Sequence, residues 1–351
     1  MTSSAFLEQA LNWQSLQPEL TLNQLSPEKV GFWDLQPNAA QALSLFLAHP
    51  KRSLFILKID EAAEYQALLS QFITEIRPTP DTIFGVNYQV EQGDSFSFPQ
   101  VYVEPAQDFT DNFASQGEVI TALNCDQFQL FGKVRQHPSS QDILLSKGLV
   151  HQANGGVLIL SAACLLNQFD LWQRLKHLLQ TQTFDWQSAH PFKALPCDIP
   201  SMSLDLKVII LGNRTEIATL GELEEALYQF ADYAEIESYY SIAEMENQQT
   251  WANYVLCQAA ELALDLDSGA LNKIYQLLVR ESEDRLLIDI SPLTIREMLL
   301  NAATLSQKQT LTADDFEAVF QQKRQQHGFL RERTYADILN EQIYVETDGE
   351  I

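Results

Sequence analysis

Acidic and amide side chains follow two apolar stretches of the chain. Asp60, Glu61 and Glu64 come after residues 53–57, and Asn213 comes at the end of residues 206–211. In an open sheet of parallel strands, ligands bind beyond the carboxyl ends of the strands. The three carboxylates could therefore hold a cation, and Asn213 could contact a nucleotide phosphate. The structural alternatives are a solvated first helical turn for the acids, where they suit the positive end of the helix dipole, and a purely structural contact for Asn213.

A third apolar run, residues 157–160, follows a polar turn and precedes Ser161 and Ala162. Ser161 could be a nucleophile, but it lacks a Gly-x-Ser-x-Gly turn and a paired base, so the sequence disfavours this role. His151 and Asn154, in the turn, could face a ligand. The pattern favours hydrogen bonds that hold the turn in place before the strand.

A phosphate-binding loop is missing where the order of elements would put it. Such a loop reads Gly-x-x-x-x-Gly-Lys-Ser/Thr, because glycines let backbone N–H groups approach the phosphates and the lysine neutralises them. Residues 58–65 read KIDEAAEY, with no glycine and three acids. The sequence has the frame of a P-loop ATPase without its loop.

The overall charge argues against two classes of partner. The 351 residues carry 22 Lys and Arg against 47 Asp and Glu, a net charge of −25. A field of this sign repels nucleic acid and anionic membranes, so neither is expected as a partner. The chain begins without a signal peptide and has no apolar run of the roughly 20 residues that span a bilayer.

The four cysteines are isolated in the sequence and form no Cys-x-x-Cys pair, which argues against zinc and redox motifs. They are Cys125, Cys164, Cys197 and Cys257. Three of the four lie beside apolar runs and are expected to be buried thiols in a reducing compartment. We therefore expect a cytoplasmic protein with no metal site.

Hydrophobic periodicity predicts a parallel α/β region followed by helices. The predicted strands of the first region are residues 53–57, 84–90, 96–103, 157–160 and 206–211. Its predicted helices are residues 39–47, 61–76 and 164–179, and residues 104–118 are predicted to be a surface loop. The helices predicted for the second region are residues 251–266, 269–280, 292–305, 312–322 and 329–342, followed by a strand from residue 343. Thr312 and Asp315 predict a capping box.

Five segments resemble the ATPase-type region of Lon-like bacterial proteases, in the branch of Lon-related ATP-dependent proteases. They are residues 148–156 (GLVHQANGG), 172–176 (WQRLK) with 184–186 (FDW), 199–202 (IPSM) and 208–214 (VIILGNR). The resemblance covers roughly residues 30–350. Residues 331–351 are similar to the linker that in this family enters a serine-lysine peptidase domain, which would lie beyond residue 351.

The resemblance implies an AAA+-like α/β domain with a small all-helical lid. The domains expected are an arm at 1–27, the AAA+-like domain at 28–245, the lid at 246–325 and the linker at 326–351. ATP and magnesium are implied by the resemblance only, and no cofactor is expected for this chain. The lysine and hydroxyl of the phosphate loop fall on Glu64 and Tyr65, and the family's acids after the central strand are replaced by Ser161 and Ala162. Asn213 matches the polar sensor residue.

Two further implications concern the lid and association. Arg296 lies near the position of the family's sensor arginine. Residues 227–236, where an arginine that completes a neighbour's site would be sought, contain none. The isolated chain is therefore expected to be a monomer or a weak dimer.

The resemblance thus implies a substrate-recognising or gating AAA+-like region of a Lon-type serine protease, and the missing phosphate loop implies that this region is a pseudo-ATPase. Its expected partners are protein substrates and a Lon-type peptidase domain. Two alternatives stay open: an active ATPase with a non-standard phosphate site, and a stand-alone protein-binding regulator.

Overall fold

The computed structural model describes residues 20, 28–78, 81–92, 98–137, 142–188 and 194–340. The chain divides into two compact units: Gln36–Ile236, and Met1–Leu35 together with Glu237–Ile351. These divisions differ from the expected boundaries at residues 28 and 245. The short helix η2 (Phe32–Leu35) buries Phe32 and Leu35 and packs against α10 (Met245–Glu261), so it belongs to the helical unit.

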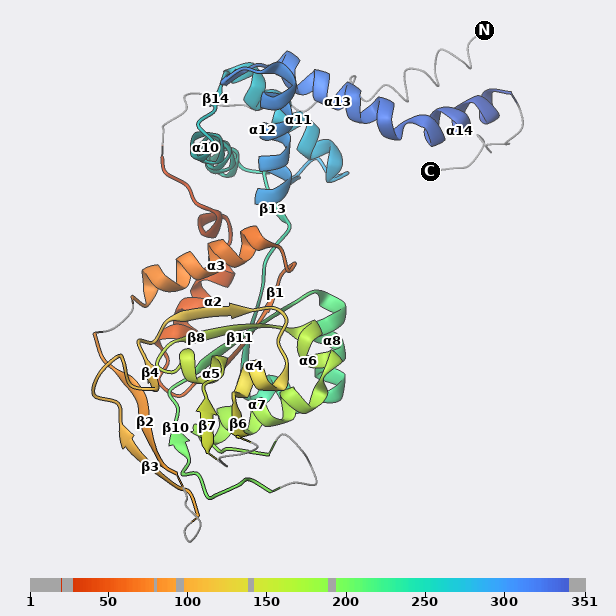
Figure 1. The fold of residues 1–351 in the computed structure, drawn as a ribbon. Helices are drawn as coiled ribbons and strands as arrows, with labels where there is room; N and C mark the ends of the chain where they lie inside the picture. Colours follow the sequence, from red (N-terminus) through yellow and green to blue (C-terminus); the bar gives the residue numbers. More distant parts are fainter. Residues whose placement is uncertain are drawn as a thin grey trace. The chain divides into compact units, whose positions relative to one another are not determined.

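A five-stranded parallel sheet forms the centre of the first unit (Figure 1). Its spatial order is β12 (Ala231–Glu235), β1 (Leu54–Lys58), β11 (Lys207–Gly212), β8 (Val157–Ser161) and β5 (Val119–Ala122). All four strand pairings are parallel. Every residue of β8 and β11 is buried, which explains their uninterrupted apolar sequences. The predicted α/β architecture with a parallel sheet is confirmed.

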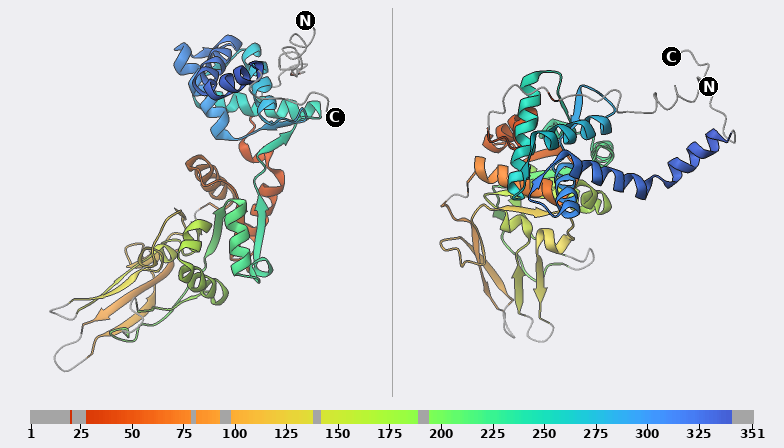
Figure 2. Two further views of the ribbon diagram at one scale, coloured as in Figure 1. Left: turned by 90° about the vertical axis from the view of Figure 1, so that its right-hand side faces the viewer. Right: turned by 90° about the horizontal axis from the view of Figure 1, so that it is seen from above.

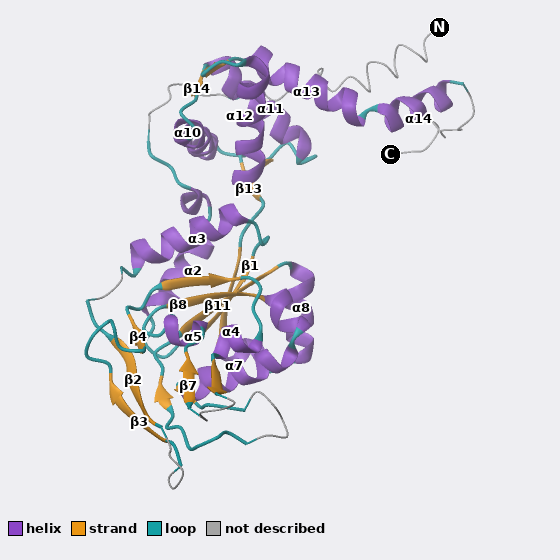
Figure 3. Ribbon diagram, viewed as in Figure 1, coloured by secondary structure: helices purple, strands orange, loops and turns teal. Residues whose placement is uncertain are grey.

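Helices flank this sheet (Figure 3). They are α2 (Pro37–Ala48), α3 (Ala63–Ile76), α6 (Ala162–Asn167), α7 (Phe169–Thr181), α8 (Arg214–Leu223) and α9 (Leu227–Phe230). Helices α2 and α3 pack on each other, while α6 packs against α7 and α8. The single helix predicted at residues 164–179 is two helices, because the backbone of Gln168 leaves the helical region at φ −136° and ψ 69°.

Smaller sheets complete this unit, and the left view of Figure 2 shows β2 and β3 as long neighbouring strands. Strands β3 (Gln100–Pro105), β2 (Phe84–Glu91) and β4 (Phe113–Ser115) form one antiparallel sheet, β6 (Lys133–Gln136) pairs with β7 (Ile143–Ser146), and β9 (Thr183–Phe184) pairs with β10 (Met202–Ser203). Two short helices, α4 (Gln127–Phe131) and α5 (Leu149–Gln152), lie in the same region.

The surface loop predicted at residues 104–118 is partly wrong. Strand β4 lies inside this segment and is buried, with Phe113 1% exposed. Its pairing with β2 satisfies backbone groups that a surface loop would expose to water. The segment therefore contributes to the core.

The second unit is helical, as predicted. Its helices are α10, α11 (Ser268–Glu281), α12 (Pro292–Ser306), α13 (Ala313–His327) and α14 (Phe329–Leu339). Two short strand pairs join them: β13 (Tyr239–Ser241) with β15 (Leu287–Asp289), and β14 (Asp265–Leu266) with β16 (Thr310–Leu311). The capping box is confirmed, since the Thr312 backbone N–H donates to Asp315 Oδ2 at 2.9 Å. The arm predicted at 1–27, except residue 20, and the strand predicted from 343 lie outside the described residues.

No helix in the described part of the chain is long and apolar enough to cross a membrane.

Candidate functional site

The carboxyl ends of four strands meet at one edge of the central sheet. Lys58, the last residue of β1, is level with Gly212 of β11 and with Glu235 of β12, and Ser161 of β8 is level with Leu211. This edge is where a sheet of this type binds a ligand. It brings together the predicted residues Asp60, Glu61, Ser161 and Asn213, all close to these strand ends.

The loop from β1 to α3 is short and its backbone donors are partly used. The N–H of Ile59 donates to Gly212 O at 3.0 Å, and the N–H of Ala62 donates to Asp60 O at 2.9 Å. A phosphate-binding loop needs such N–H groups directed at the ligand. The lysine of a phosphate-binding loop is expected at position 64, where this chain has Glu64, in the first turn of α3. Its carboxylate therefore lies at the positive N-terminal end of the helix, which would otherwise attract an anion.

Lys58, the one lysine of this loop region, is held by an acid of the same sheet. Its Nζ lies 2.6 Å from Glu235 Oε2, and the Tyr233 hydroxyl donates to Glu235 Oε1 at 2.7 Å. These two hydrogen bonds, from Lys58 first, lower the pKa of Glu235. Arg214, at the start of α8, lowers it further through its charge. The lysine's charge is thus matched by a carboxylate of the protein.

Glu61 extends a carboxylate toward the end of β8. Burial raises the pKa of Glu61, the Ser161 hydroxyl opposes this by hydrogen bonding, and the charge of Glu216 raises it further. Glu61 Oε1 is enclosed and has no hydrogen-bond partner among the described residues. Glu61 is therefore hydrogen-bonded to Ser161 at the end of β8 and is close enough to Glu216 for the second carboxylate to influence its pKa.

Ser161 has a structural contact of its own. Its Oγ accepts a hydrogen bond from the Cys164 N–H at 3.2 Å and caps α6, and the residue is 1% exposed. The following Ala162 is fully buried, and a Cβ on Gly212 would lie only 2.8 Å from the Ala162 Cβ. The two strand ends are packed too closely for a larger side chain at Gly212 without movement.

Asn213 caps helix α8. Its Oδ1 accepts from the Glu216 N–H at 3.0 Å, while its own N–H donates to Glu216 Oε2 at 2.9 Å, which makes a reciprocal capping box. The side chain is thereby committed to the helix start. The contact corresponds to the structural alternative for Asn213.

His151 and Asn154 lie before β8, at the opposite end of that strand from Ser161, and their hydrogen bonds hold the turn together, as the pattern favoured. His151 Nδ1 accepts from the Gly148 N–H at 3.0 Å, and Asn154 Oδ1 accepts from the Asp205 N–H at 2.8 Å. His151 is fully buried and stacks on Trp186, with ring centroids 5.5 Å apart. Burial, and then the charge of Arg174, lower the pKa of His151 to about 3, so the ring is neutral.

Arg296, the expected sensor arginine, is bound within the helical unit. Its guanidinium forms an ion pair with Glu261, and its Nε donates to Gln258 Oε1 at 2.8 Å. Both partners belong to α10. The arginine's charge is therefore already matched inside its own unit.

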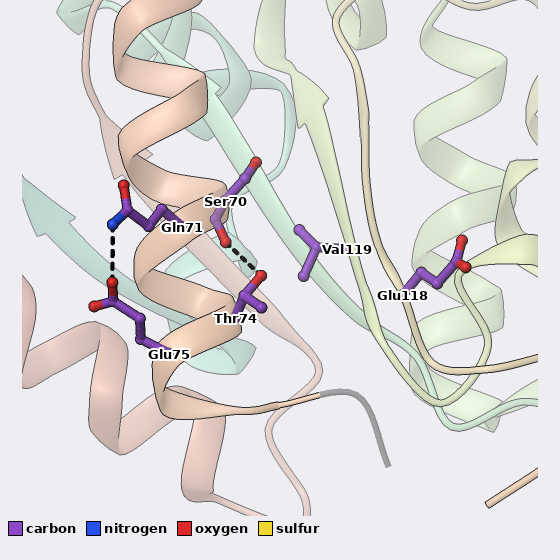
Figure 4. Close-up of a pocket in the computed structure, with 6 residues that line it drawn as sticks. All are labelled: Ser70, Gln71, Thr74, Glu75, Glu118 and Val119. Atoms are coloured by element: carbon purple, nitrogen blue, oxygen red, sulfur yellow. Dashed lines mark hydrogen bonds between the residues drawn. The ribbon is translucent and has the colours of Figure 1, made fainter. Parts of the chain in front are cut away.

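A separate pocket of about 540 Å³ lies between α3 and the start of edge strand β5 (Figure 4). Two of its polar side chains bond within α3: Thr74 Oγ1 donates to Ser70 O at 2.8 Å, and Gln71 Nε2 donates to Glu75 Oε1 at 2.9 Å. This arrangement offers no reactive group, and the described residues contain no cluster of three or more potential metal ligands.

Sequence reasoning missed Glu235, Tyr233 and Glu216. Glu235 and Tyr233 belong to β12, for which the sequence analysis predicted no strand. The segment Ala231–Glu235 does not alternate strictly, since its buried residues are Ala231 and Ala234, and therefore carries little local signal. The electrostatic influence of Glu216 on Glu61 depends on the spatial order of the strands and carries no local signal.

Comparison with known proteins shows which proteins this chain resembles. A family model described as "LonB-like, AAA domain" matches residues 115–235. A protein from Haemophilus influenzae with the name "Putative Lon protease homolog" is 66% identical over 345 residues, which is 98% of this chain and 57% of that protein. A protein of the same name from Escherichia coli is 34% identical over 324 residues, 91% of this chain and 53% of that protein.

The chain thus spans a little more than half the length of these two relatives. Among solved structures, NtrX from Brucella abortus in complex with ATP is similar with a TM-score of 0.46 and 13% identity, over 89% of this chain and 57% of that one. A second NtrX structure, in complex with ADP, has a TM-score of 0.45 and 13% identity, over 90% and 59%.

Proposed function

Because the chain belongs to a Lon-related family and contains an AAA-type domain, we propose that it recognises or gates protein substrates for a Lon-type serine peptidase without hydrolysing ATP. The peptidase would lie in the same longer protein or in a partner chain. The AAA+-like unit then acts as a fixed scaffold. Nucleic acid and membranes are not proposed as partners, because the net charge is −25.

One observation carries the proposal: the protein's own carboxylates occupy the edge where phosphates would bind. Glu61 is hydrogen-bonded to Ser161 and its pKa is raised by the charge of Glu216, and Lys58 is paired with Glu235. A charge 4 Å from a like charge costs about 1 kcal/mol in water and about 4 kcal/mol at an effective dielectric of 20. The residues present therefore do not fit a magnesium-bound triphosphate, and no catalytic step is assigned to one.

The helical unit supports the same conclusion. A sensor arginine must be free to follow nucleotide state, whereas Arg296 is paired with Glu261 and bonded to Gln258. Without a nucleotide to bridge subunits, and without an arginine in residues 227–236, the chain is proposed to be a monomer or a weak dimer.

Substrate binding tests the proposal directly. Fluorescence anisotropy of a labelled unfolded protein, such as reduced carboxymethylated α-lactalbumin, should show saturable binding whose affinity is the same with and without Mg-ATP. Binding that requires Mg-ATP would favour the active ATPase instead. The absence of any binding to unfolded protein would contradict substrate recognition.

An active ATPase with a non-standard site stays the second candidate because of Arg214. Its side chain is exposed at the start of α8, close enough to Tyr233 and Glu235 to shift the pKa of both. A phosphate could compete for this arginine. If the site works in this way, R214Q should abolish nucleotide binding, whereas in the proposed function R214Q changes nothing in the substrate assay.

A further inference from the structure

A surface cavity of about 350 Å³ lies at the opposite edge of the central sheet, where strands begin. Its lining includes Lys207, the first residue of β11, and Arg77, at the end of α3. The ends of β1 and β11 form the site described above, so these two regions are separated by the length of the strands. The cavity is therefore a distinct feature of the same unit.

Lys207 provides a fixed positive charge at this cavity. Its ammonium donates to three carbonyl oxygens: Phe46 O at 3.0 Å, His49 O at 2.7 Å and Arg52 O at 2.7 Å. These bonds satisfy its three donors but do not neutralise it. The residue is 6% exposed and forms no ion pair within the described residues. Burial, and then the charge of Arg77, lower the pKa of Lys207 to about 8.

Arg77 brings unused hydrogen-bond donors to the same cavity. Its Nη2 donates to Gly155 O at 2.9 Å, and this is its one acceptor among the described residues. Its Nη1 is enclosed and has no partner there. A buried donor without an acceptor costs roughly 1–3 kcal/mol, so a small rotation of the guanidinium toward an acceptor in the cavity would be favourable.

The remaining lining is apolar apart from Asp205 and His49, whose Nδ1 accepts a hydrogen bond from the Lys51 N–H at 3.1 Å. Leu47, Pro50 and Ile76 contribute hydrocarbon surface, and the Asp205 side chain is exposed at the rim. Two cations against one carboxylate leave the cavity with a net positive charge of about one. That balance suits a singly charged anion with a short apolar group better than a phosphate dianion, which needs more donors and would meet stronger repulsion from Asp205.

We propose that this cavity binds a carboxylate carried on a short apolar group, with Arg77 as hydrogen-bond donor and Lys207 as the fixed charge. The carboxylate could belong to a free acid or to the C-terminal residue of a polypeptide. Both sources present the same chemistry to Arg77, and only the second continues as a peptide chain beyond the cavity.

Isothermal titration calorimetry at constant ionic strength tests this assignment, with butyrate, acetyl-Ala-Leu with a free carboxylate, the same peptide as its amide, and inorganic phosphate. The free-carboxylate ligands should bind with millimolar affinity, and the amide and phosphate at least tenfold more weakly. A peptide carboxylate that binds tenfold tighter than butyrate identifies a polypeptide end, and equal affinities identify a free acid. Equal binding of peptide acid and amide, or no binding of either carboxylate at 50 mM, would overturn the proposal.

Variants locate the site. R77Q should weaken carboxylate binding at least tenfold, whereas the matched variant R135Q, at an exposed arginine of β6, should bind as the wild type does. If R77Q does not fold, D205N provides a second test. D205N is expected to fold, because the exposed Asp205 side chain makes no hydrogen bond within the described residues. Removing this competing charge should tighten binding at least threefold. Unchanged affinity in D205N, or wild-type affinity in folded R77Q, would refute the assignment.

Discussion

Protonation of the buried His151 should destabilise the first unit as the pH falls. The pKa is about 3 in the folded protein and about 6.5 in the unfolded chain, so the unfolded state binds one more proton between these values. Stability is therefore complete above pH 6.5 and is lost as the pH falls toward 3. The slope is about 1.4 kcal/mol per pH unit, which gives about 2 kcal/mol between pH 6.5 and 5 and about 5 kcal/mol in full.

The variant H151F separates this effect from the acid sensitivity of the carboxylates. At pH 7 it should be less stable by roughly 1–3 kcal/mol, because the Gly148 N–H loses its acceptor. Between pH 6.5 and 5 its stability should fall less steeply than that of the wild type. Urea unfolding followed by tryptophan fluorescence measures both slopes.

A matched control is F113L, which alters a ring 5.0 Å from His151 without removing a titrating group. It should lower stability by a similar amount at every pH. If H151F and the wild type show the same slope between pH 6.5 and 5, the ring is protonated in the folded protein and the reasoning fails.

Three further predictions follow from packing and charge. G155A should destabilise the protein by roughly 2–4 kcal/mol in urea unfolding, because Gly155 has φ +80° and a Cβ would lie 2.2 Å from the Phe84 ring. The control G31A, where the nearest contact of a Cβ is 3.6 Å, should be near neutral. Equal effects of the two variants would contradict this prediction. Cys125 and Cys164 should react with iodoacetamide at least a hundredfold more slowly than Cys257. Both thiols are buried, and burial raises the pKa of Cys125 to about 12. Comparable reaction rates by mass spectrometry would show that the two thiols are accessible. Light scattering at micromolar concentration should find a monomer or weak dimer, and a stable hexamer without ligand would refute that expectation.

Local patterns predicted those parts of the fold in which one strong periodicity dominates. Strand β8, strand β11 and the helices of the second unit have continuous apolar runs or clear helical spacing, and all were anticipated. The short strands were not, because β4 has three residues and β12 mixes apolar and charged side chains without a strict alternation. The division of the units at Leu35 has no local signal in the sequence, since it depends on the packing of η2 on a helix more than 200 residues later.

The sequence predicted which motif residues are missing from the candidate site, but it did not predict which side chains interact there. The absence of glycine and lysine from residues 59–65 is visible in the sequence, as is the replacement of acids by Ser161 and Ala162. The pairing of Lys58 with Glu235 depends on strand register between residues far apart in the chain. The same holds for Glu61 and Glu216, which are brought together by the sheet order alone.

The central claim is that the protein's own carboxylates exclude Mg-ATP from the strand ends, and calorimetric titration tests it most directly. The wild type should show no saturable binding up to millimolar Mg-ATP. The variant E61Q/E235Q, which removes two of these carboxylates, should bind at least tenfold more tightly than the control D314N/E332Q, which makes the same charge change at two exposed acids of the helical unit. Low-micromolar binding of Mg-ATP by the wild type, with one site per chain, would contradict the account.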